Sequence, residues 1–275
     1  MRISRKFPDR KSPMKVLFLG DIVGKVGRRT VANNLEKLAK KYQVDFVIAN
    51  GENVTHGKGL IEKHYYELLN CGIDCITLGN HYLSKDRILE YIDSADALVR
   101  PLNLSKRIGG EGSRLFEVNG VKIRVTNILG TAFMKEEVSS PYYSLKSLID
   151  SLESEDSIHI VDYHAEATGE KMCFGYAFDG LVSAVLGTHT HVQTNDAKIL
   201  ENGTAFMSDV GMCGAANGVL GFEKNSVMRV TMFGEKERFS IDEQDQGLIN
   251  GVVIDFDEYT HKAREIVTIK YLEEK

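Results

Sequence analysis

Leu186-Gly187-Thr188-His189-Thr190-His191 is the stretch from which the rest of this chain is best interpreted. It completes the apolar run 181–186, which predicts a buried strand because it is short and uncharged. A glycine then ends the strand, and two histidines stand at positions i and i+2. In extended backbone this spacing places both imidazoles on one side of the chain, where two neutral rings can chelate a metal. The alternative is two histidines in an exposed loop, so the other strand ends must supply further ligands.

The first part of the chain repeats one pattern three times: a buried strand, a polar strand end and a helix. Apolar runs at 15–19, 45–49 and 75–78 predict the strands, and helices are expected after Gly27, over 61–69 and over 87–92. Such units predict a parallel sheet covered by helices, in which ligands bind beyond the carboxyl ends of the strands. The polar side chains at these three ends are Asp21, Glu52 with Asn53, and Asn80 with His81.

The second part of the chain adds antiparallel strands. Residues 115–118 and 121–128 flank Asn119-Gly120, which predicts a hairpin. A strand over 157–161 ends in Asp162 and His164. The other expected elements are a helix over 145–152, a hairpin over 197–207, a glycine-rich lid over 211–221, a helix over 223–233, and strands over 238–241, 248–256 and 263–271. With no repeat or linker, residues 14–275 are expected to form a single domain.

The strand ends together provide carboxylates, amides and imidazoles at one predicted rim. This set exceeds what one tetrahedral zinc requires and suits two metals that share a bridging carboxylate. Two-metal centres activate a hydroxide and neutralise phosphate oxygens, which is the chemistry of phosphoryl transfer. The predicted ligand-type residues are Asp21, Glu52, Asn53, Asn80, His81, His164, His189 and His191.

Each of these residues also has a structural interpretation when taken alone. Asp21 can cap the following helix, Asn53 and Asn80 can serve in turns, and His164 can be a hydrogen-bonded core histidine. Asp162 and Asp209 can orient a ligand imidazole or occupy turns. It is much less probable that five separate strand ends carry ligand-type residues by chance than that one of them does. The metal interpretation is therefore favoured.

Composition narrows the class of protein. The 275 residues have a net charge of -5, with 43% hydrophobic and 27% charged residues, which is ordinary for a globular protein and argues against coating of nucleic acid. The four cysteines lack paired spacing and are expected to be reduced, as in a cytoplasmic protein. No apolar run approaches the roughly 20 residues of a membrane span. Residues 1–13 are basic without an apolar segment, so we expect a flexible tail rather than a secretory signal.

Five sequence blocks carry a family resemblance. They are Gly20-Asp21-Ile22-Val23-Gly24, Asn50-Gly51-Glu52-Asn53, Gly79-Asn80-His81, His164-Ala165-Glu166-Ala167-Thr168, and 187–193. The Gly-Asn-His and Gly-x-His-x-His blocks resemble those of the calcineurin-like metallophosphoesterase superfamily, and the five together resemble its YmdB-like bacterial family. The resemblance runs from about Met14 to the C-terminus, with further agreement at 209–212.

This resemblance implies a four-layer α/β/β/α sandwich of the metallo-dependent phosphatase type, with mixed sheets and helices outside. It implies a site for two metals, iron or manganese above all with zinc as an alternative, and a phosphodiesterase activity that includes 2′,3′-cyclic nucleotides such as 2′,3′-cAMP. By position, Asp21, Glu52 and His191 would hold one metal, with Asn53 at or next to it. Glu52 would bridge, and Asn80, His164 and His189 would hold the second. His81 would protonate the leaving alkoxide, a role that suits an imidazole.

The chain departs from these patterns in two places. Val23 stands where the wider superfamily has a histidine, and Glu52-Asn53 replaces its second block, so one metal would be held more by oxygen ligands. Leu83 and Ser84 follow Gly-Asn-His where the family commonly has Trp and Asp, so the pocket wall beside His81 is expected to differ.

These observations favour a di-metal phosphodiesterase that uses a metal-bridging hydroxide and His81 as general acid. The alternatives are a phosphomonoesterase or nucleotidase on the same site, and a non-catalytic, metal-dependent nucleotide-binding regulator. The expected partners are a small phosphodiester or nucleotide substrate and further copies of the chain in a homo-oligomer. Neither a membrane nor a stable nucleic-acid complex is expected.

Overall fold

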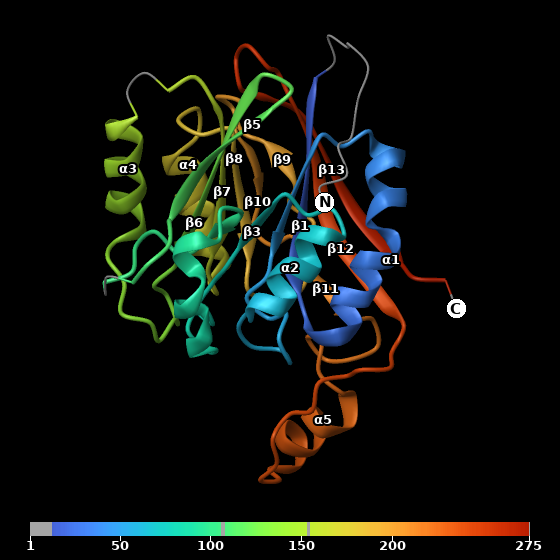
Figure 1. Ribbon diagram of the computed structural model, residues 1–275. Helices are drawn as coiled ribbons and strands as arrows, with labels where there is room; N and C mark the ends of the chain where they lie inside the picture. The colour runs from blue at the N-terminus through green and yellow to red at the C-terminus, as the bar shows by residue number, and fades with distance from the viewer. Residues whose placement is uncertain (1–12, 106–107, 153–154, 275) are drawn as a thin grey trace.

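Two mixed β-sheets packed face to face form the centre of the computed structural model, which describes residues 13–105, 108–152 and 155–274 (Figure 1). The first sheet has seven strands in the order β13-β12-β11-β1-β2-β3-β4, and the second has six in the order β5-β6-β7-β8-β10-β9. The strands of the first sheet are β1 (Met14–Ile22), β2 (Phe46–Asn50), β3 (Cys75–Thr77), β4 (Leu98–Val99), β11 (Met212–Ala215), β12 (Gly247–Phe256) and β13 (Ala263–Leu272). Those of the second are β5 (Ser113–Val118), β6 (Val121–Leu129), β7 (Ile158–His164), β8 (Ala184–Thr188), β9 (Lys198–Ile199) and β10 (Ala205–Met207).

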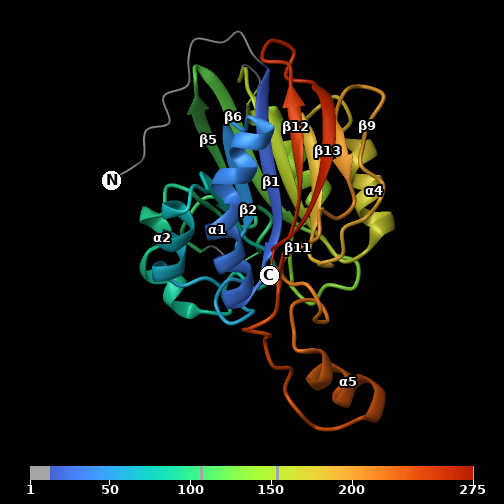
Figure 2. The ribbon, with the colours of Figure 1, turned by 90° about the vertical axis from the view of Figure 1, so that its right-hand side faces the viewer.

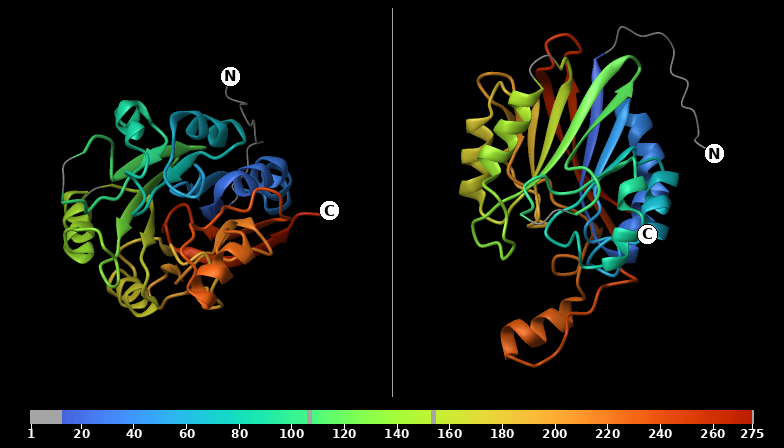
Figure 3. Two further views of the ribbon diagram at one scale, coloured as in Figure 1. Left: turned by 90° about the horizontal axis from the view of Figure 1, so that it is seen from below. Right: turned by 60° about the vertical axis from the view of Figure 1, so that its left-hand side comes forward.

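Helices lie on the outer face of each sheet. Viewed along the sheets, α1 and α2 flank the first sheet and α3 and α4 the second, while α5 projects away from all four layers (Figure 3). Figure 2 shows α1 over the first sheet beside β12 and β13, with α5 again apart from the body. The helices are α1 (Gly24–Tyr42), α2 (Glu62–Asn70), α3 (Pro141–Ser151), α4 (Thr168–Ala177) and α5 (Lys224–Phe233).

Side-chain alternation along β1 explains the layering. Leu17 and Leu19 pack in a core with α1 and α2, whereas Val16 and Phe18 pack in a second core between the sheets. Successive strand residues point to opposite faces, so a strand that is apolar at every position can be buried on both sides. A third core lies between the second sheet and α3 and α4. The observed arrangement is the α/β/β/α sandwich that the family resemblance implied.

The predicted sheet topology is confirmed in its main features. The β1–β2 and β2–β3 pairs are parallel, and antiparallel β5 and β6 form the hairpin at Asn119-Gly120. The hairpin predicted over 197–207 is formed by antiparallel β9 and β10. The strand before the paired histidines begins later than predicted, at Ala184, and Leu181 is half exposed. It also continues through Gly187 to Thr188 instead of ending at the glycine.

The expected lid over 211–221 is wrong in its first half. Met212–Ala215 form β11, a buried strand that pairs with β1 and β12. Gly211 serves backbone conformation and close packing, because its φ is 85° and a Cβ there would overlap the Asn250 side chain. The sequence pattern did not distinguish this requirement from flexibility.

Three further local predictions are corrected. The helix expected over 87–92 consists of two 3-10 turns, Asp86–Glu90 and Ile92–Ser94. Residues 238–241 form no strand, and Ile241 makes only an isolated bridge to Phe222. Helix α4 escaped prediction because glycines interrupt its apolar pattern; Gly175 is needed where the helix packs on Phe206, which a Cβ would overlap.

Other expectations concern the cysteines, the membrane and the tail. All four cysteines are free. None of the helices in the described part of the chain combines the length and hydrophobicity that a transmembrane span requires. The basic tail expected over 1–13 lies, apart from Pro13, outside the described residues.

The core between the sheets can be tested at Phe18, which is completely buried. We expect Phe18→Ala to lower the free energy of unfolding by about 3–5 kcal/mol, through lost burial and the cavity left behind. Phe133→Ala is the control, because Phe133 is 89% exposed and its replacement should change stability by less than about 0.5 kcal/mol. Urea denaturation measures both, and equal effects would contradict this assignment of the core.

Candidate metal centre

The predicted site residues come from the carboxyl ends of strands in both sheets. Asp21 lies in β1, Glu52 and Asn53 follow β2, and Asn80 and His81 follow β3. From the second sheet, His164 is the last residue of β7, and His189 and His191 follow β8. The structure brings all of them into one connected network of close side-chain contacts.

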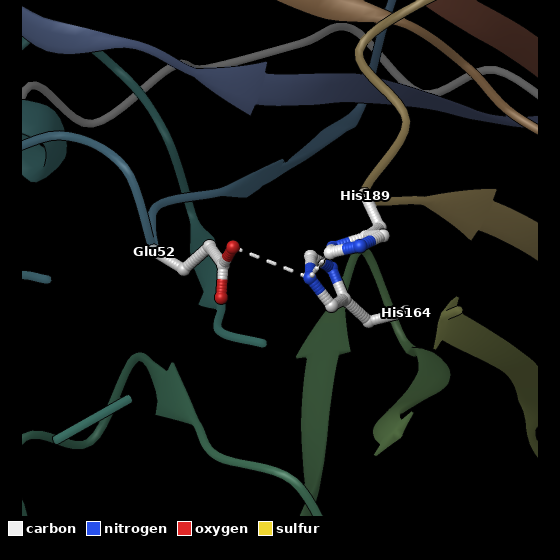
Figure 4. Close-up of side chains that lie close together, drawn as sticks. All are labelled: Glu52, His164 and His189. Atoms are coloured by element: carbon white, nitrogen blue, oxygen red, sulfur yellow. Dashed lines mark hydrogen bonds and ion pairs between the residues drawn. The ribbon is translucent and has the colours of Figure 1, made fainter. Parts of the chain in front are cut away.

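One half of this network is centred on His164. Its Nε2 lies 3.0 Å from Nδ1 of His189, 3.0 Å from Oδ1 of Asn80 and 3.2 Å from Oε1 of Glu52. Figure 4 shows the Glu52 carboxylate facing the two imidazoles. The ligand atoms of Glu52, His164 and His189 lie within 4.8 Å of one another, so this group can hold a metal ion. Gly79 makes the approach possible, because a Cβ there would overlap both Glu52 and His164.

The other half is centred on Asn53. Its Nδ2 lies 3.1 Å from Nε2 of His191, 3.2 Å from Oε1 of Glu52 and 3.3 Å from Oδ1 of Asp21. Three potential hydrogen-bond acceptors thus face one amide nitrogen, which has only two hydrogens to donate. Oε1 of Glu52 belongs to both halves.

Hydrogen bonds outside the centre set the tautomer of His164. The Thr188 hydroxyl donates to Asp162 at 2.6 Å, so its oxygen accepts from Nδ1–H of His164 at 2.8 Å. Burial raises the pKa of Asp162 to about 6, so its carboxyl is largely ionised at neutral pH and accepts this bond. The relay leaves Nε2 of His164 directed at the centre.

His189 and His191 are oriented in the same way. The Glu166 carboxylate lies 3.1 Å from Nε2 of His189, which favours a proton there and leaves Nδ1 free for the centre. The Leu220 carbonyl accepts from Nδ1–H of His191 at 3.0 Å, which leaves Nε2 free. Each ring therefore turns toward the centre the nitrogen that no outside acceptor holds, which is the nitrogen that a metal would take.

The charges at the centre require a positive partner. Burial raises the pKa of Asp21. Burial opposes ionisation of Glu52 as well, but His164 and His81 hold its pKa well below its usual range. Burial alone would lower the pKa of His164, yet Glu52 and the neighbouring carboxylates raise it to about 9. In metal-free protein a proton on His164 thus occupies the place between these groups that a cation can take.

His81 lies beside this centre. Its Nδ1 is 2.8 Å from Oδ1 of Asn53 and 3.2 Å from Oε1 of Glu52, and its backbone N–H donates to Oε2 of Glu52 at 2.7 Å. Its side chain is 25% exposed, so it can reach a bound molecule. The carboxylate and amide acceptors favour a proton on Nδ1, which makes Nε2 the atom that can pass a proton outward.

Sequence reasoning missed several residues that support the centre. Thr188 and Glu166 stand in the family blocks without an assigned role, and nothing in the sequence marks Lys171. Asp162 was proposed as an orienting residue, and it could be found because strand alternation places it on the face of β7 that carries His164. Leu83, one of the departures beside His81, packs against the core under α2.

Comparison with known proteins identifies the family to which the chain belongs. A profile of the YmdB-like protein family matches residues 17–269. This chain belongs to that family. The match covers most of the chain and includes every block on which the resemblance rested, so the predicted family is confirmed.

Individual relatives agree with this assignment. The 2′,3′-cyclic-nucleotide 2′-phosphodiesterase of Bacillus subtilis is 41% identical over 256 residues, covering 93% of this chain and 96% of that protein. A crystal structure described as a novel phosphatase of Mycoplasma pneumoniae is 42% identical with a TM-score of 0.89, covering 95% of this chain and 94% of that one. The chain is an enzyme of the hydrolase class, as expected.

More distant structures share the fold alone. The 5′-nucleotidase precursor of Thermus thermophilus is 11% identical with a TM-score of 0.57, covering 94% of this chain and 54% of that one. Its likeness confirms the predicted fold class.

The Thr188 relay can be tested by metal binding. We expect Thr188→Val to weaken manganese binding about 10–100-fold, because His164 loses the acceptor that fixes its tautomer. Thr126→Val is the matched control, since Thr126 is equally buried and bonds His159 at 2.8 Å outside the site. Calorimetric titration of metal-stripped protein measures both. Equal affinity in the two variants would refute the relay.

Proposed function

We propose that this chain is a di-metal phosphodiesterase that hydrolyses small phosphodiesters, 2′,3′-cyclic nucleotides among them. The name of the Bacillus subtilis relative supports the substrate class. The donor set supports the metals, because imidazole nitrogens with carboxylate and amide oxygens suit iron, manganese and zinc.

The observation that carries the proposal is the position of Glu52 between the two halves of the centre. Oε1 is 3.2 Å from Nε2 of His164 on one side and 3.2 Å from Nδ2 of Asn53 on the other. A single carboxylate oxygen that lies between the two halves could be shared by two neighbouring cations, as a bridging ligand would be.

The residues fit the proposed ions in two groups. Asp21, Glu52 and His191 would hold one, and Glu52, Asn80, His164 and His189 the other. Asn53 would lie next to the first group, with its Oδ1 held toward Nδ1 of His81. When bound, such ions polarise a phosphoryl oxygen and lower the pKa of a bound water.

His81 would then supply the proton. Hydrolysis of a phosphodiester releases an alkoxide, which leaves more readily if it is protonated as the bond to phosphorus breaks. With Nδ1 held by Asn53 and Glu52, Nε2 is the atom that would donate to the leaving oxygen. A cyclic diester fits this assignment because its leaving oxygen stays on the product and needs only a proton.

Replacement of His81 tests the mechanism. We expect His81→Ala to lower kcat about 10²–10⁴-fold toward bis-p-nitrophenyl phosphate and 2′,3′-cAMP in manganese-loaded protein, with metal content kept. The loss should be smaller for the p-nitrophenyl ester, whose leaving group needs less protonation. His261→Ala is the control, since His261 pairs with Asp156 away from the site.

A panel of esters separates the proposal from its alternatives. Faster turnover of 5′-nucleotides and p-nitrophenyl phosphate than of any diester would replace it with a phosphomonoesterase. Tight nucleotide binding without metal-dependent turnover would replace it with a regulator.

The compartment and the assembly belong to the same proposal. Four free cysteines support a reducing, cytoplasmic setting. The projecting helix α5 exposes Met232 and Phe233, and a homo-oligomer would cover such apolar surface. Light scattering of the purified protein tests the assembly, and a monomer at all concentrations would remove it.

A further inference from the structure

A buried ion pair lies directly behind the paired histidines and is not part of the proposed chemistry. Lys171 in α4 and Asp209 after β10 are both about 1% exposed, and Nζ of Lys171 lies 2.8 Å from Oδ2 of Asp209. Lysine and aspartate are seldom buried this completely.

The pair holds the backbone on both sides of His189. Lys171 Nζ donates to the carbonyl oxygen of Thr188 at 2.8 Å. Oδ2 of Asp209 accepts from the backbone N–H of Thr190 at 3.0 Å, and Oδ1 accepts from Gly211 N–H at 2.8 Å. The peptide groups before and after His189 are therefore attached to one buried pair.

This backbone is strained where the histidines stand. The φ angles are 99° at His189 and 65° at His191, in the left-handed region that non-glycine residues rarely adopt. Such conformations persist only where the surroundings over-determine them. The N–H of His189 is also held, at 3.1 Å from Oδ2 of Asp21.

Stability alone does not account for the pair. Removing two charges from water costs free energy that their attraction often fails to recover, so a buried ion pair is weak evidence for a stabilising role. Its hydrogen bonds instead go to the segment whose strain needs support.

We propose that Lys171 and Asp209 are positioning residues that hold the 188–190 backbone in its strained conformation, so that His189 and His191 aim their free nitrogens at the centre. This inference rests on the proposed function, because it assigns the aimed nitrogens to metal ions. The pair itself touches neither ion nor substrate.

The test measures metal binding in variants of the full-length protein. Lys171→Met removes the charge and keeps much of the side-chain volume, and the double variant Lys171→Met/Asp209→Asn leaves no charge unpaired. We expect both to raise the Kd for manganese about tenfold or more for at least one ion, as loss of supporting groups does in metal sites. The visible absorption spectrum of cobalt-loaded protein should also change, because it responds to the geometry of the nitrogen ligands.

Arg124→Met is the matched control. Arg124 is also buried and pairs with Glu155, with Nε 2.6 Å from Oε1, but its bonds lead to Ser113 and not to the site. We expect this variant to lose thermal stability while keeping the manganese Kd and the cobalt spectrum of the wild type.

The outcomes separate the inference from the proposed function. If the wild type binds no divalent ions, the proposed function fails and this inference falls with it. If the wild type binds them and the folded Lys171 variants bind equally well with the same spectrum, only the positioning role is overturned. Failure of both Lys171 variants to fold, while Arg124→Met folds, would also overturn it, because the pair would then serve the fold.

Discussion

The candidate metal centre requires a positive charge among its buried carboxylate oxygens and imidazole nitrogens. Asp21 and Glu52 are almost completely buried, and the inward nitrogens of three imidazoles face the same centre. Such atoms repel one another unless a proton or a cation lies between them. The neighbouring carboxylates raise the pKa of His164, so a proton on this ring can meet the requirement in metal-free protein. The supporting bonds from Thr188, Glu166 and Leu220 fix which nitrogens take part.

Much of this could be predicted because strand ends are local features. Buried runs such as 15–19 and 45–49 are visible in the sequence, and parallel strands bring their carboxyl ends to one rim wherever the helices lie. The positions of Asp21, Glu52, His164 and His189 follow from that rule. The same short sequence blocks identify the family, so the family could also be predicted from the sequence.

What could not be predicted depends on contacts between distant segments. A glycine such as Gly211 looks alike in a sequence whether it serves a mobile loop or a close strand contact, and only the packing of β11 on β1 decides. Lys171 lies in a helix with little apolar pattern and looks like a surface residue. Its burial depends on Asp209, 38 positions away, and the positive φ angle of His189 depends on both.

The division of the proposed ligands between the sheets has a consequence for how the protein can be altered. Asp21, Glu52 and Asn80 come from one layer, and His164 and His189 come from the other. Beneath them the layers are joined by a buried apolar core and by the hydrogen bond from Asn50 to Asp162. Neither layer can be transplanted to another scaffold with its chemistry intact. Any sliding of one layer over the other would change the distances between Glu52 and the residues of the second sheet. The packing between the sheets therefore determines how accurately these polar side chains are positioned.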